Sequence, residues 1–145
     1  MFEEKYIFRL KEKLSRDEVF ALVGKEFEKN DIVTKDFIEA LKKRENTFPT
    51  GIILENNTPT AISHTDDKYV FLDKIAIVIS DFPIIFKNIE NGTSDVPCKV
   101  FFIMALTKQN KNDILMVLTE LLEEHEAEIN NFRNMTNKEI LNFLI

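Results

Sequence analysis

The stretch "VFFIMAL" (residues 100–106) is the longest apolar run in the chain and decides the fold class. Seven residues are too few for an amphipathic helix or for a span across a bilayer. The run is rich in β-branched and aromatic side chains, as is "KIAIVIS" (residues 74–80). Both stretches therefore predict strands that are buried on both faces of a sheet.

Shorter runs extend this pattern outward. "TAIS" (residues 60–63) and "YIFRL" (residues 6–10) predict two further strands. Ser15 and Glu18 have the spacing of a capping box, which opens a helix. The expected inward stripe of that helix is Val19, Phe20, Leu22, Val23 and Phe27. A second helix is expected from about Thr34.

Helical spacing returns after the last apolar run. Residues 111–129, "KNDILMVLTELLEEHEAEI", predict one long helix. Its expected inward residues are Leu115, Leu118, Leu121 and Leu122. Thr136 and Glu139 form a second capping box. Because helices flank the buried strands, we predict one α/β domain over residues 1–145, with a central mixed β-sheet covered by helices on both faces.

Composition excludes several classes of function. The 25 acidic and 19 basic residues give a net charge of −6, which is the wrong sign for a surface that binds nucleic acid. The single cysteine, Cys98, predicts a reducing compartment. The first residues have neither the basic region nor the apolar core of a signal peptide, and no run is long enough for membrane insertion. A cytoplasmic protein is expected.

His64 is the residue whose position suggests chemistry. It follows the predicted strand 60–63 and precedes an acidic turn, in "TPTAISHTDD" (residues 58–67). In open α/β sheets, ligands and reactions collect beyond the carboxyl ends of the strands. A neutral imidazole is nucleophilic near pH 7 and can take a phosphoryl group. A solvated turn residue is the alternative, and position alone does not decide between the two.

Two motifs carry a family resemblance. The first is "LKKRENTFPTGI" (residues 41–52), with an Arg-Glu pair and a Pro-Thr-Gly loop; the second is "TAISHTDDKYV" (residues 60–70). At this spacing the chain resembles enzyme IIA domains of the phosphoenolpyruvate-dependent sugar phosphotransferase system. The similarity is to the fructose and mannitol superfamily, and most closely to its galactitol-type branch. The resemblance extends over nearly the whole chain.

The resemblance implies a phosphotransferase with a phosphohistidine intermediate. His64 would accept a phosphoryl group from the phosphohistidine of the carrier protein HPr. It would donate that group to a cysteine of an enzyme IIB, which serves a membrane enzyme IIC in sugar or polyol uptake. No cofactor is implied. The permease partner selects the sugar, so "galactitol-type" describes the sequence and does not assign a substrate.

Supporting roles follow from the same resemblance. Arg44 would offer its planar guanidinium to the phosphoryl oxygens. Thr65 would donate a hydrogen bond to the same group. The alternatives are a helix-end cation for Arg44 and a hydroxyl bonded to nearby backbone for Thr65. Asp66 and Asp67 are expected to be turn residues.

The chain departs from the family pattern at three places. Ser63 stands where relatives usually have proline, which is expected to loosen the backbone, and Tyr69 stands where the galactitol-type pattern often has histidine. Many relatives carry a second histidine at the start of the long helix. That neighbourhood here contains Asn112, Asp113 and Ile114. The other histidine, His125, is expected on the solvated face of the helix.

Other readings remain open at this point. A metal site built from His64, Asp66 and Asp67 has suitable ligand types but no distant fourth ligand. A hydrolase would need an activated nucleophile, and Cys98 has no motif around it. The stronger alternative is a phosphorylation-sensing regulatory module that binds partner proteins, since relatives of this domain also have that role.

Overall fold

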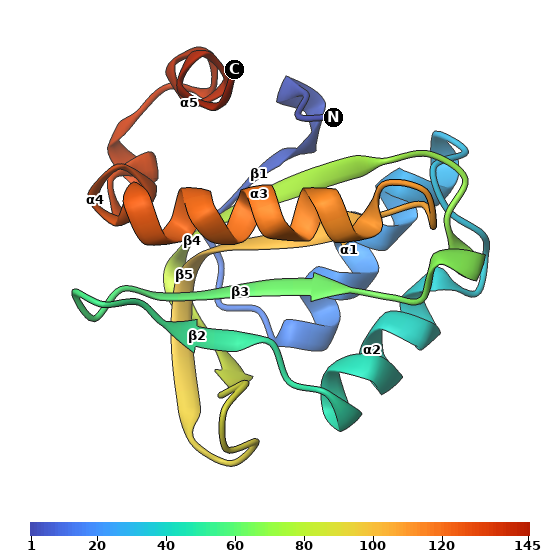
Figure 1. Ribbon diagram of the computed structural model, residues 1–145, viewed down its shortest axis with the longest axis horizontal. Coiled ribbons are helices and arrows are strands. Elements are labelled where there is room, and N and C mark those ends of the chain that lie inside the picture. Colours follow the sequence, from blue (N-terminus) through green and yellow to red (C-terminus); the bar gives the residue numbers. More distant parts are fainter.

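A computed structural model describes all residues, 1–145, and contains one mixed sheet. The strand order is β1-β4-β5-β3-β2 (Figure 1). The strands are β1 (Ile7–Leu10), β2 (Gly51–Ile53), β3 (Pro59–His64), β4 (Lys74–Lys87) and β5 (Asp95–Ala105). β1 runs parallel to β4 and β3 runs parallel to β5, whereas β4–β5 and β2–β3 are antiparallel. The predicted mixed sheet is confirmed.

Helices cover both faces of this sheet, as predicted (Figure 1). The helices are α1 (Arg16–Lys29), α2 (Phe37–Thr47), α3 (Lys111–Glu124), α4 (Glu126–Asn130) and α5 (Asn137–Leu144). α1 and α2 pack on one face and share a core cluster with Phe101 and Ile103. α3, α4 and α5 pack on the other face with Phe102 and Met104. Neighbouring residues of β5 thus point to opposite cores, which explains its continuous apolar run.

The strands extend further than the apolar runs indicated. β4 continues through the segment 82–86, after a register shift between Ile79 and Ile84. Pro83 lies in this irregular region, where its missing N–H costs no ladder hydrogen bond. The short strand β2 was not predicted, because three residues are too few to show a period.

The capping boxes are present, but one residue of the first helix is placed differently. Both the Ser15–Glu18 pair and the Thr136–Glu139 pair make the two reciprocal hydrogen bonds. Leu22, however, is 39% exposed, so its predicted inward position was wrong. At 100° per residue, Leu22 lies outside the arc of the five residues of this helix that are buried. The second helix also begins at Phe37, three residues later than expected.

The predicted long helix is interrupted at His125. α3 ends at Glu124, and His125 has φ −127° and ψ 38° before α4 begins. The buried carboxylate of Glu126 accepts the backbone N–H groups of Asn56 and Thr58 at 2.9 and 3.0 Å. This long-range contact fixes the start of α4 on the β2–β3 turn and redirects the chain.

His125 consequently lies at a helix junction. The expected position within a continuous helix was wrong, whereas the side chain is solvated as expected: it is 43% exposed, with one edge of the ring packed against Phe143 at a centroid distance of 5.4 Å. Of the four leucines predicted to face inward, Leu118 and Leu122 are buried and the other two are half-buried.

None of the helices combines the length and the apolar character needed to cross a bilayer.

Candidate functional site

His64 is the last residue of β3 and pairs in parallel register with Met104 of β5. The predicted strand ended at Ser63, with His64 just past it, whereas β3 ends one residue later and includes His64. β4 begins at Lys74, opposite Ala105 at the end of β5, so this end of the sheet brings three strand ends together. We call it the His64 edge. The His64 side chain is half-buried there, held by the sheet and still reachable from solvent.

A backbone hydrogen bond fixes the orientation of the His64 imidazole. Nδ1 lies 2.8 Å from the carbonyl oxygen of Ile62. A carbonyl only accepts, so Nδ1 carries the proton and Nε2 keeps its lone pair. Nε2 has no partner in the chain, and it is not among the buried atoms without a partner. The unprotonated nitrogen is therefore not sealed from solvent.

The surroundings also keep this imidazole neutral. Burial is the largest cause that holds the pKa of His64 below its usual value, and the charges of Arg44 and Lys111 act in the same direction. The hydrogen bond to Ile62 and the charge of Asp66 oppose them. The nucleophilic form is thus favoured near neutral pH.

This predicts a pH dependence. A titration of the His64 ring protons by NMR is expected to give a midpoint below 6.5, the value for an unperturbed histidine. The unfolded chain then binds more protons between the two pKa values, so folding stability falls as the pH decreases from about 6.5. A midpoint at or above 6.5 would show that the imidazole is not kept neutral.

Arg44 lies in the last turn of α2, close enough to His64 for its charge to lower the pKa of the imidazole. Its Nη1 donates to a carboxylate oxygen of Asp66 at 3.0 Å, and its guanidinium stacks over the ring of Phe48 at 5.4 Å. Its Nε is buried and has no hydrogen-bond partner. Arg44 is therefore held in place, while its Nη2, which makes no hydrogen bond and is not a buried atom, remains free for an anion. Asp66, expected only as a turn residue, is also its ion-pair partner.

Thr65 is buried, and its hydroxyl donates to the carbonyl oxygen of Asp66 at 2.9 Å. This is the backbone-bonded alternative, in the chain without a phosphoryl group. Asp67 opens the short 3₁₀ turn Asp67–Tyr69, as a turn residue should. Tyr69 lines a cavity of about 220 Å³ together with Arg44 and Asp66.

No role was predicted for Glu45, but its carboxylate supports the strand that carries His64. It is 2% exposed and accepts hydrogen bonds from the backbone N–H of Thr50 at 2.7 Å and from its hydroxyl at 2.8 Å. The hydroxyl of Ser63 donates to it at 3.0 Å. Burial raises the pKa of Glu45, and the donors from Thr50 and Ser63 oppose that rise.

Glu45 thus joins the end of α2, the Pro-Thr-Gly loop and the strand that carries His64. Ser63 was expected to loosen this backbone, but it pairs with Ile103 of β5 and is tied to Glu45. A signal was available in the sequence. Glu45 lies four residues after the buried Leu41, on the same face of the helix, where a charged residue is unusual.

The Glu45 contacts predict an effect on stability. In Glu45→Ala the buried N–H of Thr50 loses its acceptor, so the free energy of unfolding is expected to fall by about 1 to 3 kcal/mol. Glu45→Gln retains an acceptor and should lose less. Glu39→Ala, on the exposed side of the same helix, is the control. Denaturant titrations measure all three, and equal losses in Glu45→Ala and Glu39→Ala would contradict the assignment.

The His64 edge also exposes apolar side chains. Phe71 and Leu72 are 60% and 52% exposed and directly precede β4. Phe48, which lies against Arg44, is 61% exposed. Such side chains near a reactive group are typical of surfaces that contact other proteins.

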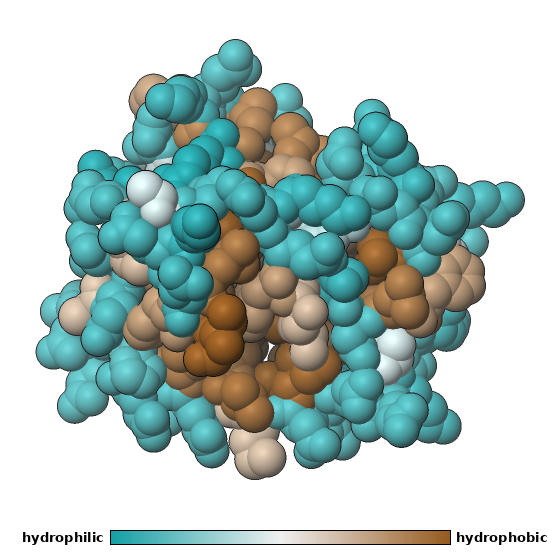
Figure 2. Space-filling view, turned by 90° about the horizontal axis from the view of Figure 1, so that it is seen from above, coloured by the Kyte–Doolittle hydropathy of each residue, from teal (hydrophilic) through white to brown (hydrophobic).

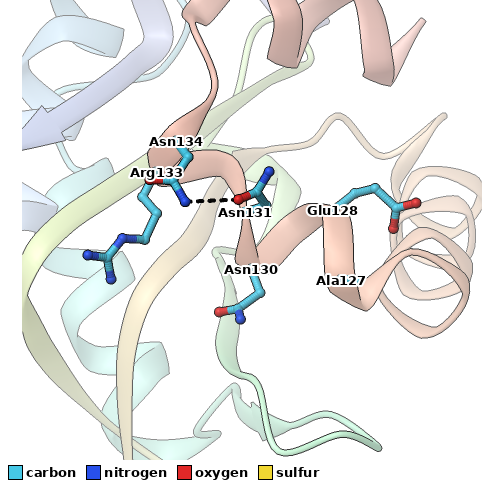
Figure 3. Close-up of a pocket in the computed structure, with 6 residues that line it drawn as sticks. All are labelled: Ala127, Glu128, Asn130, Asn131, Arg133 and Asn134. Carbon is cyan, nitrogen blue, oxygen red and sulfur yellow. Dashed lines mark hydrogen bonds between the residues drawn. The ribbon is translucent and has the colours of Figure 1, made fainter.

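The larger cavities lie elsewhere. One of about 690 Å³ is formed within residues 127–134 (Figure 3). Glu128 and Arg133 point away from each other there, and Asn134 donates to Asn131 at 2.9 Å. Its polar groups do not converge on a common point, as a binding site requires. Its lining includes none of the predicted site residues.

A second cavity, of about 390 Å³, is an apolar hollow between the amino-terminal residues, α3 and α5. Apolar side chains gather around a hollow on this face (Figure 2). Its residues are Met1, Phe2, Ile75, Asp113, Ile114, Val117, Leu118, Leu121 and Leu144. With one carboxylate and no lysine or arginine, this lining does not suit a phosphoryl group.

The chain offers few groups for other chemistry. No three His, Cys, Asp or Glu side chains are placed to hold a metal ion. Cys98 is buried, and burial raises the pKa of its thiol far above the usual range. A thiol in that state is not a nucleophile. The His64 edge is therefore the candidate site.

Known proteins share this fold. Residues 1–145 match the model of the family described as phosphoenolpyruvate-dependent sugar phosphotransferase system, EIIA 2. No curated protein matches the chain significantly by sequence. Among solved structures, IIA mannitol from Escherichia coli is similar with a TM-score of 0.76 and 18% identity, over 99% of this chain and 98% of that one.

Two further solved structures are similar. The complex of IIA mannitol with phosphorylated IIB mannitol from Escherichia coli gives a TM-score of 0.69 at 17% identity, over 90% of this chain and 88% of that one. The nitrogen regulatory protein IIA-Ntr from Neisseria meningitidis gives 0.72 at 20%, over 99% and 96%. At these identities the similarities establish the fold, and the family match covers every residue. The chain therefore belongs to the EIIA 2 family of the phosphoenolpyruvate-dependent sugar phosphotransferase system.

Proposed function

We propose that this chain is a phosphocarrier that accepts a phosphoryl group on Nε2 of His64 from phosphorylated HPr. It then passes the group to the cysteine of an enzyme IIB. One observation carries the proposal: the Ile62 carbonyl holds the proton on Nδ1, which leaves Nε2 unprotonated, not sealed from solvent and within reach of the Arg44 charge.

Each transfer is an exchange of one bond to phosphorus for another. In the first step the Nε2 lone pair of His64 forms a bond to phosphorus. The N–P bond of the donor phosphohistidine breaks, and its electron pair stays on the donor imidazole. In the second step a cysteine thiolate of enzyme IIB attacks phosphorus, and His64 leaves as a neutral imidazole. Nδ1 keeps its proton and its bond to Ile62 throughout, so the ring does not need to reorient.

Arg44 stabilises the negative charge of the phosphoryl group in these steps. The transferring group carries close to two negative charges, and Asp66 adds a third nearby. The guanidinium of Arg44, whose charge reaches the imidazole, offsets part of this charge, and its Nη2 has free donors for the phosphoryl oxygens. Thr65 supports the phosphoryl group only if its hydroxyl turns away from the Asp66 carbonyl.

The two proposed partner proteins, HPr and enzyme IIB, need a shared binding surface on this chain. Both HPr and enzyme IIB must bring a side chain to the same Nε2, one after the other. Phe48, Phe71 and Leu72 provide a partly apolar surface at the His64 edge for a weak, transient contact of this kind. The similarity to the IIA component of a mannitol IIA–IIB complex supports an enzyme IIB partner. Enzyme IIB would in turn serve a membrane enzyme IIC.

In this role the chain takes part in sugar or polyol uptake of the galactitol, fructose or mannitol type. The match to the EIIA 2 family and the similarity to IIA mannitol support that range. The proposed exchange with HPr places the chain in the cytoplasm.

The proposal is tested by intact mass spectrometry. We expect one added phosphoryl group after incubation with phosphoenolpyruvate, enzyme I and HPr, and none when HPr is omitted. Addition of a cognate enzyme IIB should then return the mass to its starting value. Phosphoryl addition without HPr would contradict the assigned donor.

A regulatory role is the second candidate. It is supported by the similarity to a nitrogen regulatory IIA protein and by the lack of a second imidazole at the start of α3, where Asn112 and Asp113 are exposed. In that case the chain would bind partner proteins according to its phosphorylation state. Phosphoryl acceptance from HPr without transfer to the enzyme IIB, or no acceptance at all, would favour this candidate.

A further inference from the structure

Lys111 is a cation at the His64 edge that motif matching did not identify. It is the first residue of α3 and is half-buried. Its Nζ lies 3.4 Å from the carbonyl oxygen of Thr65, the residue that follows His64. The sheet brings these segments together, because β3 and β5 end side by side and α3 begins shortly after β5.

The turn that carries Lys111 is firmly attached to the sheet. The carboxylate of Asp73, next to the start of β4, accepts the backbone N–H of Thr107 at 2.7 Å and the side-chain amide of Asn110 at 2.6 Å. The backbone N–H of Lys111 bonds to the Thr107 carbonyl oxygen at 3.0 Å. The ammonium group is therefore held near Thr65 by contacts on both sides of the turn.

A phosphorylated His64 edge would need more positive charge than Arg44 supplies. A phosphoryl group on His64 adds close to two negative charges beside Asp66. Arg44 already pairs with Asp66, so its charge is shared. Lys111 makes no ion pair, and its one hydrogen-bond partner is a neutral carbonyl. An ammonium group has three N–H donors, so two remain for an incoming anion.

We infer that Lys111 is a second phosphoryl-binding residue, whose ammonium group contacts the phosphoryl oxygens on His64 from the α3 side while Arg44 does so from the α2 side. This inference rests on the proposed function. It assigns the two cations different states: Arg44 is held by Asp66 before the group arrives, and Lys111 has two N–H donors free for the phosphoryl oxygens. The effect of Lys111 on the pKa of His64 agrees with this placement, since its charge reaches the imidazole.

The test measures the equilibrium of phosphoryl exchange between HPr and the full chain. In Lys111→Met, which keeps the apolar stem and removes the charge, we expect the equilibrium to shift toward phosphorylated HPr by roughly tenfold. Lys111→Arg should stay within about twofold of the wild type. Lys108→Met is the matched control, because Lys108 is exposed, lies three residues earlier in the same region and makes no hydrogen bond or ion pair.

The outcomes separate this inference from the proposed function. An unchanged thermal melting curve for Lys111→Met, together with the shifted equilibrium, supports direct contact with the phosphoryl group. A wild-type equilibrium in Lys111→Met, or an equal shift in Lys108→Met, overturns the role of Lys111 while the phosphocarrier proposal stands. A wild-type chain that takes no phosphoryl group from HPr overturns both.

Discussion

Replacing His64 with alanine is expected to abolish phosphoryl acceptance from HPr. The variant loses the one side chain that presents an unprotonated, accessible ring nitrogen at the His64 edge. No other nucleophile is available there, since the thiol of Cys98 is buried. Acid-labile phosphate, measured after incubation with phosphoenolpyruvate, enzyme I and HPr, reports the result. The His64 side chain is only half-buried, so the fold should persist.

His125→Ala is the control for this experiment, because it removes the only other imidazole. His125 lies at the junction of α3 and α4, against Phe143 and 3.7 Å from a carboxylate oxygen of Glu128. The His125→Ala variant should accept the phosphoryl group at nearly the wild-type level. Wild-type labelling of His64→Ala would sink the assignment of His64. Loss of labelling in His125→Ala alone would move the acceptor to the other histidine.

The second large effect is expected for Arg44→Ala. Removing positioned donors from a site of developing charge costs about 2 to 4 kcal/mol in comparable oxyanion sites, or roughly 30- to 1,000-fold in rate. The variant also leaves Asp66 without its ion-pair partner, and its free carboxylate then repels the phosphoryl group. Rapid-mixing measurements of transfer from phosphorylated HPr give the rate.

Two variants separate these contributions. Arg44→Lys keeps a charge but loses the planar fork, so an intermediate rate is expected. Asp66→Asn keeps Arg44 and removes the opposing charge, so it should not slow transfer. The Arg44–Asp66 pair is partly exposed and adds little to folding stability, so none of these variants should unfold the chain. A rate for Arg44→Ala within about twofold of the wild type would rule out its role.

Much of the fold could be predicted from local sequence because burial on both faces leaves a clear pattern. The runs 74–80 and 100–106 form parts of the interior strands β4 and β5, since each is covered by helices on either side. The break at His125 could not be predicted. It depends on Glu126 reaching the turn at Asn56, a contact between residues 70 positions apart.

The candidate site also contains some residues that could be predicted from the sequence and others that could not. His64 and Arg44 could be proposed because two motifs lie at a recognisable spacing. Glu45 lies within the first motif, but its role appears only when Thr50 and Ser63 are seen to converge on it. Lys111 lies outside both motifs, residues 41–52 and 60–70. It reaches Thr65 because β3 and β5 are parallel neighbours, which is a property of the sheet and not of any local stretch.

The most direct test of the central claim is to determine which ring nitrogen carries the phosphoryl group. Nitrogen-15 NMR of histidine-labelled chain, recorded before and after incubation with phosphoenolpyruvate, enzyme I and HPr, resolves the four ring nitrogens of the two histidines. We expect coupling to phosphorus at Nε2 of His64, with the proton still on Nδ1 opposite the Ile62 carbonyl. Phosphorus on Nδ1 of His64, on His125, or on neither histidine would contradict the account.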